Sequence, residues 1–244
     1  MLCSYATSGI AQSTKTGTVN RPEVETPEEI QMEAPVQIGE RLELFVDRHL
    51  IETMTKVEFR LHEPQRLPLP ESPLTGAYMT IIKDGDLHRA YYRGDDPDYT
   101  GRRNYSGHPG EITCYAESRD GHEWTFPALG LFDVNGTHSN NVILAKEPPF
   151  HHNFSPFLDT RPGVDQNERF KALAGHPGFN RNNLGGLHSF ASPDGIHWKK
   201  SSDKPVIPYQ QSWSHAFDSQ NVSFWSEAEQ LYVAYFRTWT RLST

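Results

Sequence analysis

A seven-residue pattern, S-x-D-G-x-x-W, occurs twice in this chain. It spans residues 118–124 (SRDGHEW) and residues 192–198 (SPDGIHW), so the two copies begin 74 residues apart. Asp-Gly is the pair that a two-residue type I′ turn favours, because both positions need a positive φ. The serine can bond to the turn backbone, and the tryptophan begins the return strand. The pattern therefore predicts two tight hairpins at a fixed interval.

Strand-like segments recur in step with these turns, and no stretch after residue 40 keeps the apolar period of a helix. First strands are expected at residues 77–82, 154–158 and 220–225, and second strands at 87–93, 168–174 and 231–237. A third strand then runs into each S-x-D-G turn and a fourth leaves from the tryptophan. Four antiparallel strands per period are typical of β-propeller blades. We predict an all-β fold, a partial propeller with blades near residues 77–132, 154–208 and 220–244.

The number of repeats is too small for a closed ring. Propellers have at least four blades, which would need about 296 residues at this period, whereas residues 41–244 supply 204. The third repeat lacks its S-x-D-G turn. We therefore expect a truncated gene product, an excised fragment, or self-association through the open blade edge.

Two segments precede the repeats. Residues 1–13 (MLCSYATSGIAQS) resemble the tail of a signal peptide, because small residues surround Ala11; this favours secretion or a periplasmic location. Residues 14–39 combine prolines with glutamates and are predicted to form a disordered leader. The partial propeller is expected to occupy residues 40–244.

Charge and cysteine content exclude several functions. The chain has 31 acidic and 23 basic residues, a net charge of −8, and no basic stripe that would bind nucleic acid. No apolar run approaches the roughly 18 residues of a membrane span. Its two cysteines, Cys3 and Cys114, build neither a disulfide framework nor a zinc site. Cys114 is predicted to be a buried strand thiol.

Three segments together resemble the five-bladed glycoside hydrolases, the invertase-like and arabinanase-like propellers. They are residues 43–47 (ELFVD), 153–157 (NFSPF) and 218–222 (DSQNV), accompanied by the two S-x-D-G-x-x-W turns. The resemblance covers about residues 41–239. It implies hydrolysis of plant or algal saccharides by carboxylates on the inner strands at the propeller axis, where two carboxyl groups face each other across the glycosidic bond.

Carried over to this sequence, the resemblance gives three candidate catalytic residues. Asp218 is the counterpart of the third blade's acid, Glu71 precedes the first inner strand, and Asp47 lies further upstream. In the second blade the family has an acid where this chain has Ser155. The fit is therefore incomplete.

Residues near the starts of the inner strands are candidates for saccharide binding. They are His215, His152, Asn153, Asn141, Gln220 and Trp213. The adjacent histidines 151 and 152 lack the spacing of a zinc site, so no metal ligands are assigned. No cofactor is required, although such hydrolases sometimes hold a calcium ion on the axis.

Two other interpretations remain open at this level. A non-catalytic carbohydrate-binding propeller is favoured by Ser155 and by the missing blades. A sialidase-like propeller has similar aspartate-containing turns. Its turn carries an extra residue between Asp and Gly, however, and it needs an arginine triad that Arg161 and Arg237 do not supply.

Overall fold

The computed structural model describes residues 35–40, 42–44, 46–66, 72–176 and 185–240. The chain divides into two units, of which residues 69–244 form the larger and residues 6–68 the smaller. The described residues of the smaller unit contain turns and bends but no strand or helix. The predicted signal remnant at residues 1–13 lies outside the described residues, as does the predicted leader apart from residues 35–39.

The first sheet has four antiparallel strands in sequence order. They are β1 (Ala77–Asp84), β2 (Leu87–Asp95), β3 (Glu111–Ser118) and β4 (Val142–Leu144). Nearly every residue of β3 is buried, because this strand is paired on both edges and covered on both faces. Cys114 lies in it as a free, buried thiol, as predicted, and burial raises its pKa to about 12.

The second sheet repeats this arrangement. It contains β5 (Ser155–Leu158), β6 (Phe170–His176), β7 (Gly186–Ser192) and the short β8 (Lys199–Lys200), with β9 (Ile207–Pro208) also paired to β7. A single 3₁₀ turn, η1 (Gln166–Glu168), precedes β6. Gly175 is required where β6 meets β7, because a Cβ there would lie 1.9 Å from the carbonyl oxygen of Gly186.

Two pairs of strands follow. One is the hairpin of β11 (Val222–Ser226) and β12 (Leu231–Tyr235), and the other joins β10 (Trp213–Ala216) to β13 (Thr238–Thr240). The all-β class, the antiparallel pairing and the expected first and second strands are thus confirmed. Within the described ranges, no helix has the length and apolar character to cross a membrane.

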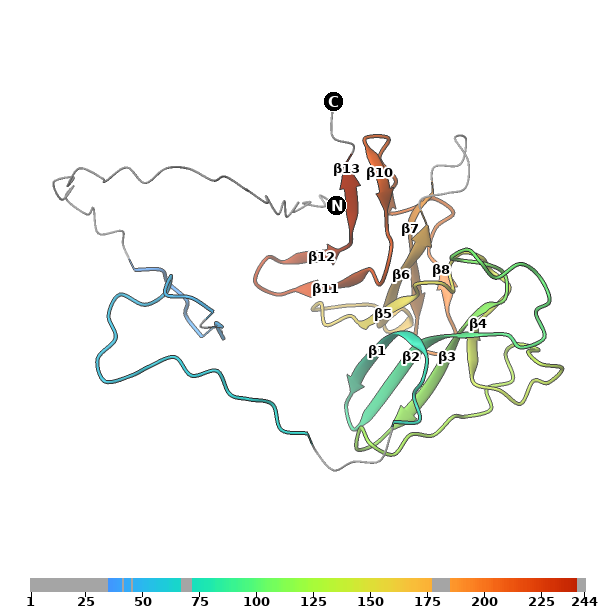
Figure 1. Ribbon diagram of the computed structural model, residues 1–244, viewed down its shortest axis with the longest axis horizontal. Coiled ribbons are helices and arrows are strands. Elements are labelled where there is room, and N and C mark those ends of the chain that lie inside the picture. The colour runs from blue at the N-terminus through green and yellow to red at the C-terminus, as the bar shows by residue number, and fades with distance from the viewer. Residues whose placement is uncertain (1–34, 41, 45, 67–71, 177–184, 241–244) are drawn as a thin grey trace, which may run out of the picture. The chain divides into compact units, whose positions relative to one another are not determined.

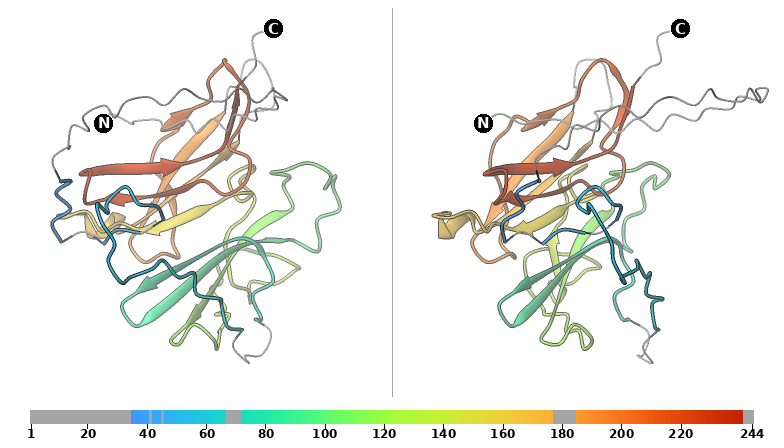
Figure 2. Two further views of the ribbon diagram at one scale, coloured as in Figure 1. Left: turned by 60° about the vertical axis from the view of Figure 1, so that its left-hand side comes forward. Right: turned by 90° about the vertical axis from the view of Figure 1, so that its left-hand side faces the viewer.

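The first strands of the three sheets lie side by side. Strand β5 lies between β1 and β11 and contacts both (Figures 1 and 2). Two apolar clusters fill the spaces between sheets. One cluster, between the first two sheets, includes Tyr91, Tyr115, Phe154, Phe170 and Phe190. The other, between the second sheet and the strand pairs, includes Leu173, Leu187, Ile207, Ala216 and Phe217.

The two S-x-D-G segments form the same loop, but it is not the predicted type I′ turn. Positive φ falls on the glycine, 79° at Gly121, and not on Asp120. The Asp120 carboxylate instead accepts hydrogen bonds from the backbone N–H groups of residues 122 and 123, both at 2.8 Å. Ser118 Oγ accepts from the N–H of Gly121 at 2.9 Å, as predicted. A carboxylate that gathers several N–H groups stabilises a wider loop than a two-residue turn.

The fourth strand of the first sheet is also displaced from its predicted place. Only an isolated bridge joins Glu117 to Thr125 after the loop, and the ladder resumes at β4, seventeen residues beyond Thr125. In the second sheet, β8 follows Trp198 as predicted and β9 continues the edge. The fourth strand is therefore split in both sheets, and its second piece pairs with the beginning of the third strand.

Candidate functional site

A buried carboxylate lies where β3 begins. Glu111 is 4% exposed, and its two oxygens lie 2.9 Å and 2.8 Å from Nδ1 of His152. Arg93, near the end of β2, places Nη1 2.9 Å from the same ring nitrogen and 3.9 Å from Glu111 Oε1. We call Arg93, His108, Glu111, His151 and His152 the Glu111 cluster. It joins the first sheet to the segment that leads into β5.

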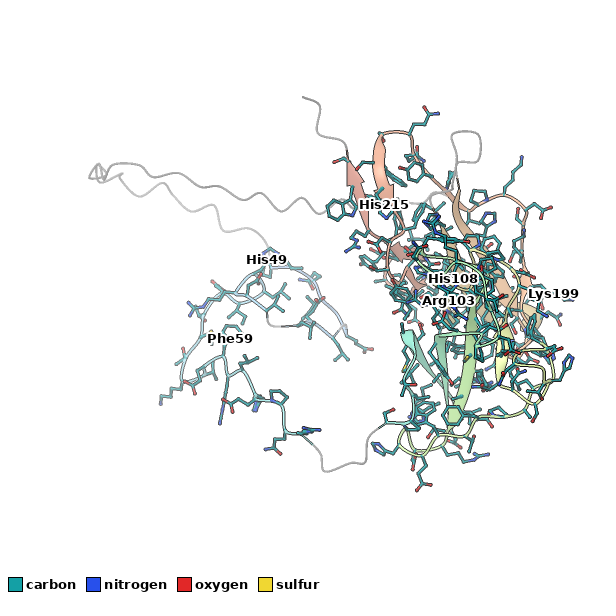
Figure 3. All side chains as sticks on the ribbon, turned by 45° about the vertical axis from the view of Figure 1, so that its right-hand side comes forward. His49, Phe59, Arg103, His108, Lys199 and His215 are labelled. Carbon is teal, nitrogen blue, oxygen red and sulfur yellow. The ribbon has the colours of Figure 1, made fainter. Side chains whose placement is uncertain are left out.

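Two further histidines complete the Glu111 cluster. His108 lies on the loop between β2 and β3 (Figure 3), with Nε2 3.8 Å from Glu111 Oε1. His151 is fully buried, its Nδ1 lies 3.9 Å from Glu111 Oε2, and neither ring nitrogen has a hydrogen-bond partner. The N–H of Gly107 donates to Glu111 Oε2 at 3.1 Å. His152 is thus the principal side-chain partner of the carboxylate.

These contacts keep Glu111 ionised. Burial by itself would raise the pKa of Glu111, but the imidazoles of His151 and His152 and the charge of Arg93 outweigh it and lower the pKa to about 2. A carboxyl group with such a pKa cannot serve as a proton donor near neutral pH. It can fix the orientation of His152 and hold a positive charge beside it, as carboxylates do for imidazoles in many sites.

A β-bulge directs Tyr78 toward this cluster. The register of β1 and β2 shifts between Ala77 and Thr80, and Tyr78 has a φ of 50°, which is unusual for a residue other than glycine. The guanidinium of Arg93 lies 4.5 Å from the centre of the Tyr78 ring, and the ring meets His152 edge-on at 5.4 Å. Bulges commonly re-aim a side chain in this way.

Asp218 lies in the segment between β10 and β11. Its carboxylate is paired with the guanidinium of Arg237, and its side chain is 38% exposed. The residues on both sides of it, Phe217 and Ser219, have φ values of 62° and 76°. This backbone lifts Asp218 out of the strands and leaves Phe217 buried in the core.

Asn153 and Gln220 tie neighbouring sheets together. Asn153 is 1% exposed; its amide nitrogen donates to the carbonyls of Gly175 and Phe217, and its oxygen accepts from the N–H of Gly175. Gln220 donates to the carbonyl of Met79 at 3.3 Å and to the Thr80 hydroxyl. Both predicted binding residues therefore lie at the beginnings of first strands, where their amides make contacts between sheets.

His215 and Trp213 belong to β10. His215 is exposed and lies opposite Trp239 of β13. Trp213 packs its ring against Tyr209 and Phe217, at 5.9 Å and 5.7 Å between ring centres, so it contributes to the core. Nearby, burial lowers the pKa of His176 to about 4, and the charges of His152 and His215 lower it further in the same direction.

Three predicted site residues remain, namely Asn141, Asp47 and Glu71. Asn141 donates to Tyr92 Oη at 3.0 Å and to the Tyr115 carbonyl, on the outer part of the first sheet. Asp47 belongs to the smaller unit, where it accepts from the N–H of His49 at 2.8 Å. Glu71 lies outside the described residues. Of the three predicted catalytic carboxylates, only Asp218 belongs to the described part of the larger unit.

A groove of about 430 Å³ runs along the three first strands. Residues 79–82 of β1, 155–158 of β5 and residues 220 and 222–224 line it. Ser155, which stands where the resemblance expects an acid, is 3% exposed. Of the predicted residues, Gln220 lines this groove, and Asp218 lies two residues before it along the chain.

The described part of the chain contains no group of three or more His, Cys, Asp or Glu side chains arranged to hold a metal ion. In the Glu111 cluster, the guanidinium of Arg93 supplies the positive charge beside the carboxylate.

The sequence interpretation missed Glu111 and Arg93. A usable signal exists for Arg93, because a basic residue recurs at the same distance from the start of each second strand. It lies three residues after Ala90, Leu173 and Ala234, at Arg93, His176 and Arg237. Glu111 has no such counterpart, and only its contact with a histidine 41 residues away reveals it.

No protein-family model, no curated protein and no solved structure matches this chain.

Proposed function

We propose that this chain is an arc of a five-bladed β-propeller that acts on plant or algal saccharides by hydrolysing glycosidic bonds. The observation that carries the proposal is the convergence of the three first strands on one groove. Polar side chains from all three sheets gather where these strands begin. A groove lined by the first strands of successive sheets is where a ligand of a propeller would bind.

Asp218 is the carboxylate best placed for the reaction. Its side chain is partly exposed and paired with the guanidinium of Arg237, and it lies two residues before Gln220, which lines the groove. Glu111 lies deeper and holds His152 and Arg93 in position. Hydrolysis also requires a proton donor, and Glu111 does not supply one near neutral pH because its pKa is lowered to about 2.

The experiment is to measure hydrolysis of a panel of plant and algal oligosaccharides by the chain and by Asp218→Asn. The substitution keeps the shape of the side chain but removes its ionisable carboxyl group. We expect the rate to fall by about 10²–10⁴-fold while saccharide binding is retained. Asp203→Asn is the control, because Asp203 is fully exposed and pairs with Lys200 at the surface. Unchanged hydrolysis by Asp218→Asn would remove Asp218 from the mechanism.

A second candidate is saccharide binding without hydrolysis. Five described carboxyl groups have pKa values lowered by their partners, those of Asp84, Glu111, Asp120, Asp159 and Asp194. A glycosidase needs one carboxylic acid that stays protonated near its working pH. Binding in calorimetry with no cleavage of any oligosaccharide in the panel would favour this candidate.

A further inference from the structure

Three basic side chains mark the same end of three successive sheets. Arg93 lies opposite Ala77 at the beginning of β1. His176 ends β6, and Gly175 next to it bonds to Asn153 at the beginning of β5. The carbonyl of Arg237 accepts from the N–H of Phe217, just before β11. We call Arg93, His176 and Arg237 the basic rim.

Contacts between sheets connect the members of the basic rim. Arg93 contacts His152, and the charge of His152 acts on His176. Arg237 pairs with Asp218, whose neighbour Phe217 accepts a hydrogen bond from Asn153 at 3.0 Å. The three basic side chains therefore follow one another along the same end of the three sheets.

In the basic rim, the side chains of the two arginines are more exposed than the carboxylates with which they pair. The acidic partner of Arg93, Glu111, is buried beneath it with its side chain 6% exposed, whereas the side chain of Arg93 is 25% exposed. The side chain of Arg237 is 49% exposed and that of its partner Asp218 is 38% exposed. A ligand entering this region meets guanidinium groups more than carboxylates.

Guanidinium groups select particular ligands. Their planar array of N–H donors matches the oxygens of a carboxylate or of a sulfate ester better than a single hydroxyl group. The pKa of His176, which burial and then the charges of His152 and His215 lower to about 4, leaves this ring neutral near pH 7. Near pH 7 the charge of the basic rim is therefore that of its two guanidinium groups.

We propose that the basic rim binds an anionic group on the saccharide, a carboxylate or a sulfate ester, so that the preferred ligand is an acidic oligosaccharide. This inference rests on the proposed function, because it assigns a substrate class to the same site.

The test is isothermal titration calorimetry on the full chain with three oligosaccharides of equal length. They are an oligogalacturonate, a sulfated galactan fragment and an uncharged galactan fragment. We expect at least one acidic ligand to bind about tenfold more tightly than the uncharged one, and the difference to shrink as salt is added. Preference for the galacturonate identifies a carboxylate, and preference for the sulfated fragment identifies a sulfate; either result supports the proposal.

Arg237→Gln tests the location. We expect this variant to reduce the ratio of acidic to uncharged affinity several-fold. Arg119→Gln is the matched control, because Arg119 is exposed just beyond the opposite end of β3 and the substitution removes the same charge. An equal loss in both variants would show that overall charge, and not the basic rim, sets the preference.

The outcomes separate this inference from the proposed function. Equal or tighter binding of the uncharged fragment would overturn the inference and leave a saccharide-binding function intact. Failure of all three oligosaccharides, together with inactivity on the hydrolysis panel, would overturn the proposed function and this inference with it.

Discussion

At Glu111, burial and pairing shift the pKa of the same carboxyl group in opposite directions. An unpaired carboxylate in this position would be strongly disfavoured, because charged groups lose their hydration when buried. His152, Arg93 and the N–H of Gly107 replace that hydration. The cluster therefore fixes the loop before β3 against the segment before β5, and its contribution to stability depends on pH.

We predict that Glu111→Gln destabilises the fold by about 3 kcal/mol at neutral pH. The folded pKa of about 2 lies below the ordinary value near 4.3. The ionised carboxylate therefore stabilises the fold above about pH 4.3, and this contribution is lost as the pH falls toward 2. Urea unfolding of both proteins, at about pH 7 and about pH 3, should show their difference shrinking in acid. Glu123→Gln, at an exposed position, is the control; a similar loss there would contradict the prediction.

At the scale of elements, two aspartates link first strands to the next sheet. One lies at the end of β1 and the other follows β5. Asp84 of β1 accepts from Arg89 of its own sheet and from Arg169, which precedes β6. Asp159 follows β5 and accepts from Lys171 at 2.8 Å and from Tyr232 of β12 at 2.6 Å. These ionic and hydrogen-bonded links lie at the end of the first strands opposite the basic rim.

Tyr232→Phe should weaken the link between the second sheet and the β11–β12 hairpin. The substitution removes one hydroxyl that donates to a buried carboxylate, which costs about 1.5 kcal/mol. Tyr235→Phe makes the same chemical change three residues away, at a side chain that is 61% exposed, and should alter the free energy of unfolding by less than about 0.5 kcal/mol. Equal effects in urea unfolding would show that the bond to Asp159 contributes nothing.

At the scale of the whole molecule, apolar side chains of the β11–β12 hairpin are exposed. Phe224 and Tyr235 are 39% and 61% exposed and stack on each other, with ring centres 6.2 Å apart, and Val222 beside them is 46% exposed. Contiguous exposed apolar groups favour association. The edge of β12 is a further surface on which a strand can pair.

We therefore expect the chain to self-associate at micromolar concentration in sedimentation velocity. Phe224→Ser should weaken the association about tenfold, as loss of a buried aromatic contact does at an interface. Phe126→Ser is the matched control, because Phe126 is 45% exposed and lies beyond the end of β3 that is remote from the basic rim. A compact monomer in the unmodified chain would contradict the prediction.

The sequence predicted the strands because their signals are local. The bounds of β1 and β5 follow from short apolar segments, and the loops at Ser118 and Ser192 follow from side chains that bond to backbone within three residues. The error at the S-x-D-G loop was also local. A type I′ turn needs a positive φ at Asp120. The Asp120 carboxylate instead accepts hydrogen bonds from two backbone N–H groups, and the loop is wider.

The site depended on tertiary structure. Arg93 meets His152 across 59 residues and Glu111 meets it across 41 residues, from two strands and a connecting segment. No local sequence pattern predicts these two contacts with His152, because they depend on how the first sheet packs beside β5 and on the bulge at Tyr78. The sequence by itself determined the strands and their repetition, through backbone preferences and side-chain alternation. Only the tertiary structure decided which charges meet, because burial and pairing depend on neighbours that are distant along the chain.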